Sequence, residues 1–234
     1  MTDKLLVPGV IGFAPATDHV YLREIQQAAS DDAAGGLVNR LRLVYATLDT
    51  DRFFEADASG RTSEAEELIA AAARSLEAAG ADFLVVTSNT GSVIAEGAGC
   101  GLPLLDIFDV TVRAAVARGG RRLGLLSTRR ALDSGRYQRA AEAHGASIVA
   151  PPGEAVDAID HMIDSEAIRG IQTPESLRLL QDTVDWLAEH GADTVISGCT
   201  DLLLFGLDAI AHGVLPIVDS TAEHAAAAAR RALG

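Results

Sequence analysis

The chain has 234 residues, 48% hydrophobic and 22% charged, which is ordinary for a globular protein and excludes an intrinsically disordered one. Its formal net charge of −14 argues against nucleic acid as a partner, because acidic surfaces repel phosphate backbones. No apolar run approaches the roughly 18 residues of a membrane-spanning helix, and the first residues do not resemble a secretory signal. Two cysteines cannot form a disulfide framework. We therefore expect a cytoplasmic protein that binds neither membrane nor nucleic acid.

Short runs of Val, Ile and Leu alternate with longer Ala-rich amphipathic segments, which predicts βα units and a parallel sheet. Strands are expected at residues 6–12, 42–47, 83–87, 104–107, 123–127, 147–150, 194–197 and 217–219. Helices are expected at residues 17–29, 63–79, 110–118, 135–144, 156–168, 174–190 and 222–233. Pro174 after Thr173 suits a first helical turn, and Ser220 or Thr221 is expected to cap the last helix. The pattern predicts an α/β protein.

An internal repeat divides the chain. Segment 80–90, GADFLVVTSNT, aligns without gaps with segment 191–201, GADTVISGCTD, and LPLLD at 102–106 resembles LPIVD at 215–219. Gly80 and Gly191 each follow an Ala-rich helix, where a left-handed residue is favoured. We predict two pseudo-symmetric α/β halves with parallel sheets. The first comprises residues 1–110 with the C-terminal segment 213–234, and the second comprises residues 111–212.

The repeat places Ser88 and Cys199 at equivalent strand ends. Ligands of open parallel sheets bind at the carboxyl ends of the strands, so we expect both side chains to face one cleft between the halves. That arrangement suits chemistry that needs one group on each face of a substrate carbon. The alternative is an old duplication that packs as a doubly wound protein with its site elsewhere.

Cys199 is the clearest catalytic candidate. It follows an apolar strand, and a thiol at a strand end that leads toward a helix N-terminus can have its pKa lowered from about 8.5. Gly198 would let the backbone approach a ligand. The alternative is a buried cysteine that acts as a small hydrophobic residue. Cys100 lies outside the repeated motifs and is expected only to pack.

These motifs resemble those of the cofactor-independent aspartate/glutamate racemase family. TSNT at 87–90 resembles the family's first catalytic motif, Cys-Asn-Thr, and GCTD at 198–201 resembles its second, Gly-Cys-Thr-Glu. Segments 10–17, 125–129, 134–137 and 216–221 resemble the family's N-terminal loop, central segment and C-terminal strand, so the resemblance covers essentially the whole chain. It implies racemisation of aspartate or glutamate by proton transfer at Cα between two cysteines. It also implies a homodimer without pyridoxal phosphate, metal or other cofactor.

The sequence departs from the family pattern at Ser88, where the first cysteine belongs. A serine hydroxyl can donate a hydrogen bond, but it is a poor base without a neighbouring activator. Three explanations stay open: a deliberate substitution that traps substrate, a natural residue with weak or one-sided activity, and one-base chemistry. Asp201 is the second departure, a shorter carboxylate where the family has Glu. It either acts in the site or stabilises a helix N-terminus.

Hydroxyl and amide side chains near the two motifs are assigned to substrate binding. Asn89, Thr90 and Thr200 are expected to hold the α-carboxylate of a small acidic amino acid together with backbone N–H groups. Arg52 matches the arginine of a Pro-Asp-Arg motif in some family members, where it pairs with a substrate carboxylate. An ion pair with a neighbouring aspartate is an equally good explanation for Arg52.

Two further residues are weaker candidates. Arg169 lies near the place of a substrate-contacting lysine in the family, and Thr128 offers either a hydroxyl to the cleft or a helix cap. We expect surface or capping positions for all the histidines, which are His19, His144, His161, His190, His212 and His224.

Two other functions stay open. The chain could be a single-cysteine enzyme of the wider superfamily, such as an arylmalonate-type decarboxylase or a maleate-type isomerase, although the Asn89-Thr90 pair fits the amino-acid racemases better. It could also be a non-catalytic protein that binds an acidic amino acid without exchanging its α-proton.

Overall fold

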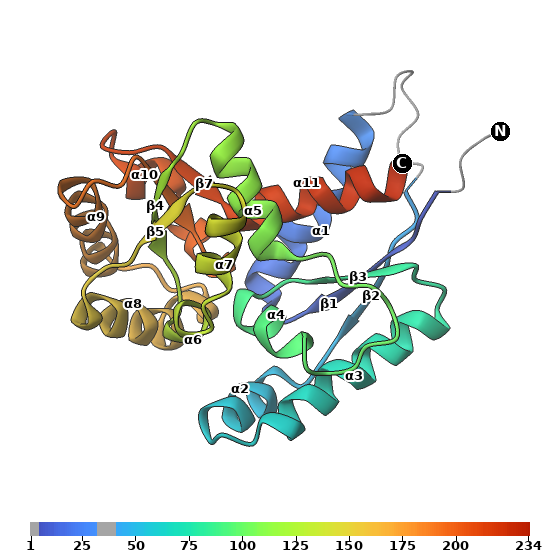
Figure 1. The fold of residues 1–234 in the computed structure, drawn as a ribbon. Coiled ribbons are helices and arrows are strands. Elements are labelled where there is room, and N and C mark those ends of the chain that lie inside the picture. The colour runs from blue at the N-terminus through green and yellow to red at the C-terminus, as the bar shows by residue number, and fades with distance from the viewer. Residues whose placement is uncertain (1–4, 32–40) are drawn as a thin grey trace. The chain divides into compact units, whose positions relative to one another are not determined.

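The computed structural model describes residues 5–31 and 41–234 (Figure 1). It confirms the α/β fold with two parallel sheets. One sheet has three strands in the order β2-β1-β3, and the other has four in the order β5-β4-β6-β7. The chain divides into two compact units. Unit 1 comprises Met1–Asp106 with His224–Gly234, and unit 2 comprises Ile107–Glu223.

Unit 1 contains the three-stranded sheet. Its strands are β1 (Pro8–Gly12), β2 (Val44–Thr47) and β3 (Phe83–Val86). Its helices are α1 (Pro15–Asp31), α2 (Thr50–Ala58), α3 (Thr62–Ala78), α4 (Asn89–Ala95) and the part of α11 (Ser220–Leu233) that begins at His224. Central β1 pairs with β2 on one side and with β3 on the other. Both faces of β1 and β3 are buried, which explains their continuous apolar sequences.

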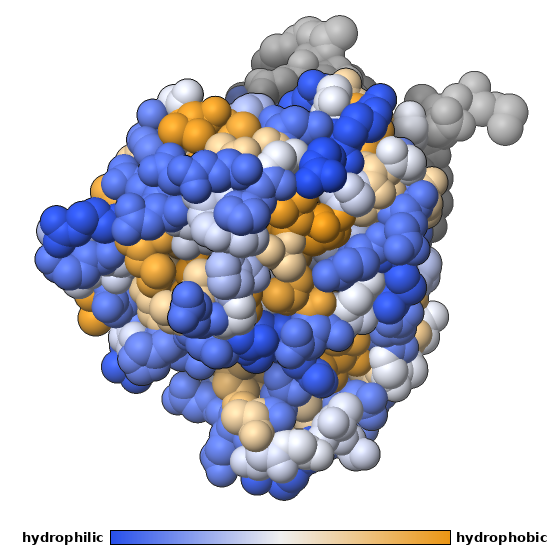
Figure 2. Space-filling model, turned by 60° about the vertical axis from the view of Figure 1, so that its left-hand side comes forward, coloured by the Kyte–Doolittle hydropathy of each residue, from blue (hydrophilic) through white to orange (hydrophobic). Residues whose placement is uncertain are grey.

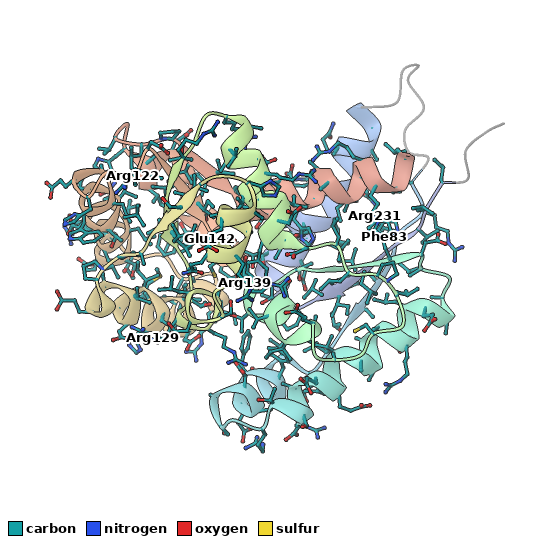
Figure 3. All side chains as sticks on the ribbon, viewed as in Figure 1. Phe83, Arg122, Arg129, Arg139, Glu142 and Arg231 are labelled. Atoms are coloured by element: carbon teal, nitrogen blue, oxygen red, sulfur yellow. The ribbon has the colours of Figure 1, made fainter. Side chains whose placement is uncertain are left out.

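Helices cover both faces of this sheet. On one face, Ile11 and Leu84 pack with Ile69 and Leu76 of α3. On the other face, alternate strand residues pack with α1 and α11 in a cluster that includes Val10, Phe83, Val85, Tyr21, Ile25, Ala225, Ala228 and Ala229. The guanidinium of Arg231 lies over the Phe83 ring, 4.6 Å from its centroid (Figure 3). The small alanines of α11 let this helix approach the strands closely.

Unit 2 contains the four-stranded sheet. Its strands are β4 (Arg122–Leu126), β5 (Ser147–Val149), β6 (Thr194–Ser197) and β7 (Ile217–Asp219). Its helices are α5 (Ile107–Ala117), α6 (Arg129–Asp133), α7 (Arg136–Ala143), α8 (Gly153–Ser165), α9 (Pro174–Glu189) and α10 (Leu207–Ala211). Two 3-10 helices, η1 (Ala167–Arg169) and η2 (Thr200–Phe205), complete it. The main core joins β4 and β6 to α8 and α9 through Leu126, Val195, Ile159, Leu180 and Val184.

The repeated glycine ends a helix in the same way in both units. Gly80 has a φ of +90° and Gly191 a φ of +84°. The Gly80 N–H donates to the Glu77 carbonyl at 2.9 Å, and the Ala81 N–H donates to the Leu76 carbonyl at 3.0 Å. Gly191 repeats both bonds at 3.0 and 2.9 Å. This pair of bonds is the Schellman motif, and it confirms the predicted left-handed helix ends.

The aspartate of the repeated Gly-Ala-Asp sequence holds the first strand of its unit. Asp82 Oδ2 accepts the Val7 N–H at 2.8 Å. In the second copy, the Asp193 carboxylate accepts the N–H groups of Arg121 and Arg122 at 3.0–3.1 Å. The repeat is therefore a helix stop followed by a side-chain link between neighbouring strands.

The predicted strand at 104–107 is wrong. Only Leu104 bridges to Leu84, and helix α5 begins at Ile107. The equivalent segment in unit 2 does form strand β7, which pairs with β6. The four-stranded sheet therefore includes part of segment 213–234, which we had assigned wholly to the first half. The first copy leaves its sheet after one residue because Asp106 already leads into a helix.

Several short helices were not predicted, among them α2, α4, α6 and α10, which have five to nine residues. Runs of that length show little apolar periodicity. The predicted cap of α9 is confirmed, because Thr173 Oγ1 accepts the Ser176 N–H at 3.1 Å and Pro174 begins the helix. The expected cap of α11 is corrected: the helix begins at Ser220, and the preceding Asp219 accepts the Thr221 N–H at 3.0 Å.

Polar and charged residues cover most of the displayed surface, and apolar residues form small groups between them (Figure 2). Within residues 5–31 and 41–234, no helix is both long and apolar enough to cross a membrane.

Candidate functional site

Ser88 caps helix α4 at the carboxyl end of β3. Its backbone is extended, with φ −146° and ψ 131°, and its Oγ accepts the Gly91 N–H at 3.0 Å. The Ser88 carbonyl accepts the Ser92 hydroxyl at 2.7 Å. Only 8% of Ser88 is exposed. The capping bond uses a lone pair of Oγ, so the hydroxyl proton can still be donated to a ligand.

Cys199 occupies the equivalent position in unit 2. It lies two residues after the end of β6, has φ −134° and ψ 129°, and directly precedes η2. It is 6% exposed, and its Sγ lies 4.0 Å from Asp201 Oδ2. Ser88 and Cys199 thus share the same backbone conformation at equivalent strand ends, as the alignment of the two segments implied.

The pKa of the Cys199 thiol is raised well above its ordinary value, first by burial and then by the Asp201 carboxylate. Backbone N–H groups of Asp201 and Leu202 oppose this shift without reversing it. The expectation of a lowered pKa is therefore wrong. A six-residue 3-10 helix follows Cys199 instead of a long α-helix, so the favourable dipole is small. Cys199 rests as a neutral thiol.

Close packing fixes the strand end before Cys199. The Gly198 N–H donates to the Leu126 carbonyl at 2.7 Å. A Cβ on Gly198 would lie 2.8 Å from Leu125 Cδ1 and 3.1 Å from Tyr137 Cε2. Tyr137 is fully buried and meets Phe108 edge-on, with 4.9 Å between ring centroids. Gly198 is therefore required by the packing of unit 2 itself.

A buried carboxylate lies at the carboxyl end of the three-stranded sheet. Asp18, in the first turn of α1, is 3% exposed. Its Oδ1 accepts the Thr87 hydroxyl at 2.7 Å and the Phe13 N–H at 3.2 Å, and its Oδ2 accepts the Tyr45 hydroxyl at 2.9 Å. Burial and this carboxylate together raise the pKa of Tyr45 to about 12. Asp18 could not be singled out from the sequence, because an aspartate in a first helical turn is too common to indicate a site.

The predicted α-carboxylate ligands lie beside the two motif residues. Asn89 and Thr90 form the first turn of α4 and are buried directly after Ser88. Thr200 begins η2 and is buried directly after Cys199. Each unit therefore gathers one candidate proton-transfer residue and at least one candidate carboxylate ligand at a strand end.

The remaining predicted site residues have structural partners or lie on the surface. Arg52 is exposed, and its Nε lies 2.6 Å from Glu64 Oε1. The expected ion pair with a neighbouring aspartate is therefore wrong: the partner of Arg52 is Glu64, and the Asp49 side chain caps α2. Thr128 caps α6 by accepting the Ala131 N–H at 3.2 Å. Arg169 lies in η1 and is exposed.

One histidine contradicts its expected surface position. His224 is fully buried between Tyr21, whose hydroxyl makes a very short contact with Nδ1, and the Leu105 carbonyl, which lies 3.0 Å from Nε2. Burial lowers the pKa of His224 to about 4, so the ring is neutral. It lies on the apolar face of α11, where Tyr21 and Leu105 supply the polar partners. Cys100 is half-buried against the core of unit 1, as expected.

The side chains at these strand ends are a thiol, hydroxyls, an amide and a carboxylate, from Cys199, Ser88, Thr90, Thr200, Asn89 and Asp201. Among the residues that the structure describes, no group of three or more His, Cys, Asp and Glu side chains is placed to hold a metal ion.

Comparison with known proteins assigns the family. Residues 9–228 match the family model described as Asp/Glu/Hydantoin racemase. The chain belongs to this family. A proposed Asp/Glu racemase from Yersinia pestis has a similar crystal structure, with a TM-score of 0.83 and 32% identity over 98% of this chain and 100% of that one.

Two glutamate racemases are also similar. The enzyme from Picosynechococcus sp. is 33% identical over 131 residues, which are 53% of this chain and only 44% of that protein. The enzyme from Francisella tularensis, solved in complex with D-glutamate, shares the fold with a TM-score of 0.64 at 14% identity, over 95% of this chain and 79% of that one. The family match confirms the resemblance that the motifs at 87–90 and 198–201 indicated. The roles of Ser88 and Cys199 stay predictions.

Proposed function

We propose that this chain transfers a proton at Cα of a small acidic amino acid, aspartate or glutamate, as a racemase that needs no cofactor. The observation that carries this proposal is the matched placement of Ser88 and Cys199, each extended, buried and directly before a helical turn. A pair of related units that each present one polar side chain suits a reaction with one group on each face of a carbon. Family membership supports the same reaction class.

In this proposal Cys199 and Ser88 differ in their strength as bases. Cys199 exchanges the proton on one face: as a thiolate it removes the Cα proton, and as a thiol it returns one. Because its pKa is raised, the active thiolate is scarce at neutral pH. Ser88 serves the opposite face as a hydroxyl donor and is a poor base. Proton exchange should therefore favour the enantiomer whose Cα–H faces Cys199.

The substrate would be held by the groups that surround the two strand ends. Asn89, Thr90 and Thr200 would bind the α-carboxylate and stabilise the enediolate that forms when the proton leaves. The Asp201 carboxylate beside Cys199 would offer a counter-charge to the α-ammonium group. Arg169 and Arg52 are the proposed partners of the side-chain carboxylate, and Arg52 would have to leave Glu64.

The test is α-proton exchange in deuterated water, followed by proton NMR for each enantiomer of aspartate and glutamate. We expect exchange of mainly one enantiomer, its loss in Cys199→Ser, and a sharp rise for the other enantiomer in Ser88→Cys. Cys100→Ser is the matched control and should exchange like the parent chain. Absence of exchange from both the parent chain and Ser88→Cys would refute the amino-acid racemase proposal. The homodimer implied by the family also stays a prediction, to be checked by light scattering.

A second candidate is favoured by the neutral thiol of Cys199 together with Ser88, a poor base, at the equivalent strand end of the other unit. Decarboxylation of a malonate creates a carbanion by loss of carbon dioxide, so it needs a proton donor and no base. Release of carbon dioxide from an arylmalonate, lost in Cys199→Ser, would support this candidate. Calorimetric binding of aspartate or glutamate without exchange or decarboxylation would instead indicate a binding protein.

A further inference from the structure

We propose that Asp18 is a positioning residue that fixes the strand end carrying Ser88, Asn89 and Thr90. This inference rests on the proposed function for its catalytic meaning, but its structural part can be tested without substrate. Asp18 belongs to none of the motifs that indicate the family, and all the contacts that support its role lie within unit 1.

The first line of contact runs through Thr87. The Thr87 hydroxyl lies 2.7 Å from Asp18 Oδ1, and the Thr87 N–H donates to the Ile11 carbonyl at 3.0 Å. Thr87 directly precedes Ser88, so these two bonds fix the peptide from which Ser88 extends. Hydrogen bonds to an ionised carboxylate are about twice as strong as neutral ones, which makes Asp18 a firm anchor.

A second, independent line of contact runs through Phe13. The Phe13 N–H donates to Asp18 Oδ1, and the Phe13 ring packs against Gly91, where an added Cβ would lie 2.5 Å from Cζ. The Gly91 N–H is the donor that the Ser88 hydroxyl accepts. Asp18 is therefore linked to Ser88 in two ways: through Thr87, its neighbour in the chain, and through Phe13, which packs against Gly91.

The Asp18 side chain is tightly packed, so its carboxylate has little room to move. A Cβ on Gly12 would lie 2.5 Å from both Asp18 Oδ2 and the Tyr45 hydroxyl. The carboxylate thus links all three strands: Phe13 directly follows β1, Tyr45 lies in β2 and Thr87 directly follows β3. A buried carboxylate with three donors tolerates little movement, because a lost donor would leave a charge without compensation.

A purely structural anchor would explain the same bonds, so the test must separate local positioning from fold stability. We would introduce a reporter thiol with Ser88→Cys in a Cys199→Ser background and measure its alkylation by iodoacetamide with mass spectrometry. Cys100, in the same unit, is the internal reference, and the ratio of the two rates is the readout. Loss of global stability should accelerate both thiols, whereas local loosening should accelerate only the reporter.

We expect Asp18→Ala to raise the ratio of reporter to Cys100 alkylation by about tenfold, and Thr87→Val to raise it in the same direction. Asp18→Asn should keep the ratio near that of the parent, because an amide can accept from Thr87 and Phe13 and donate to Tyr45. The matched control is Asp82→Ala, which removes an aspartate at the opposite end of the same sheet. It should lower the melting temperature without changing the ratio.

The catalytic part is tested in the chain that retains Ser88 and Cys199. Asp18→Ala should lower the kcat of α-proton exchange about tenfold or more with a smaller change in KM, because misplaced groups lose rate before binding. An unchanged alkylation ratio in Asp18→Ala would overturn the positioning role, whatever the activity. If neither the parent chain nor Ser88→Cys exchanges the α-proton, the proposed function is refuted, and a raised alkylation ratio in Asp18→Ala would still uphold the positioning role.

Discussion

At Cys199 the neighbouring residues decide the chemistry more than the motif does. The family pattern and the strand end were visible in the sequence, but the raised pKa comes from burial and from Asp201. The burial follows from packing around Gly198, Leu125 and Tyr137, which no single segment reveals.

Removal of the Asp201 charge should make the thiol more reactive. In a Cys100→Ser background, Asp201→Asn should lower the pKa of Cys199, and burial should still hold it above its ordinary value. The measurement is the rate of Cys199 alkylation as a function of pH. The midpoint should move to lower pH in the variant; a midpoint that stays in place would mean that burial alone sets the pKa.

His224 should make unit 1 sensitive to acid. Its folded pKa of about 4 lies below its ordinary value of 6.5, so the unfolded chain binds the proton more tightly. Stability is therefore present above pH 6.5 and is lost as the pH falls toward 4, by about 2 kcal/mol at pH 5.

Urea denaturation at pH 5 and at pH 7.5 measures this loss. His224→Gln keeps a donor for Leu105 and an acceptor for Tyr21 but cannot be protonated, so the difference between the two pH values should shrink. An equal difference in parent and variant would assign the acid sensitivity to other groups.

Asp18 and His224, whose surroundings could not be predicted from the sequence, have partners far away in the chain. Asp18 meets Thr87 across 69 residues, and His224 meets Tyr21 across 203. Local sequence gives an aspartate in a first helical turn and a histidine in an alanine-rich helix, both ordinary. Ser88 and Cys199 could be identified because aligning the two copies of the repeat places them at the same strand end.

At the scale of helices and strands, the Gly-Ala-Asp repeat explains how each unit closes. The glycine ends α3 or α9, and the aspartate holds the start of β1 or β4. Both glycines have positive φ, but their surroundings differ. A Cβ on Gly191 would lie 3.1 Å from the Arg122 guanidinium, whereas one on Gly80 would lie 3.8 Å from Arg42.

Alanine at either glycine should therefore destabilise the protein, by about 1 kcal/mol from the left-handed backbone alone. Gly191→Ala should cost more than Gly80→Ala, because Arg122 must also move. Urea denaturation of both variants checks the order. Equal losses of stability in the two variants would show that Arg122 moves without a cost in free energy.

The role of Thr128, as a helix cap or as a site residue, can be tested by substitution. Thr128→Ala should destabilise the protein by about 1 kcal/mol, because the Ala131 N–H loses its acceptor. Thr128→Ser keeps an acceptor and should restore stability. If Thr128→Ala lowers α-proton exchange at a temperature at which it is still fully folded, while Thr128→Ser does not, the hydroxyl also acts in the site.

Long helices were predicted to within a few residues and most short strands were also found, whereas the short helices were missed. The missed helix α4 matters most, because it places Asn89 and Thr90 in a first helical turn with Ser88 as its cap. A seven-residue helix is held by its cap and by tertiary packing more than by propensity, so its sequence carries little periodic signal.

At the scale of the whole molecule, charge should limit stability. The chain carries 33 acidic and 19 basic side chains, so repulsion among acidic groups outweighs the attraction in exposed ion pairs such as Arg52–Glu64. Added sodium chloride should therefore raise the thermal midpoint, since salt screens this repulsion. Thermal unfolding at low and high salt checks the sign; a midpoint that falls would mean that the ion pairs dominate.

The sequence predicted two related sheets but not their unequal size. Leu104 and β7 follow equivalent proline-containing segments, and only the second continues as a strand. The difference lies in where the next helix begins, which depends on packing that the repeat does not encode.

The division of the chain also sets an order of events during synthesis. Unit 2 is one continuous segment, Ile107–Glu223, whereas unit 1 needs Ala225–Ala232 to fill its core beside Val10 and Phe83. A ribosome that adds about 5–20 residues per second makes unit 2 in roughly ten seconds. Throughout that time one face of the nascent β1 and β3 is covered by α1 without α11. Unit 2 is therefore complete before unit 1, whose core closes only when α11 has been made.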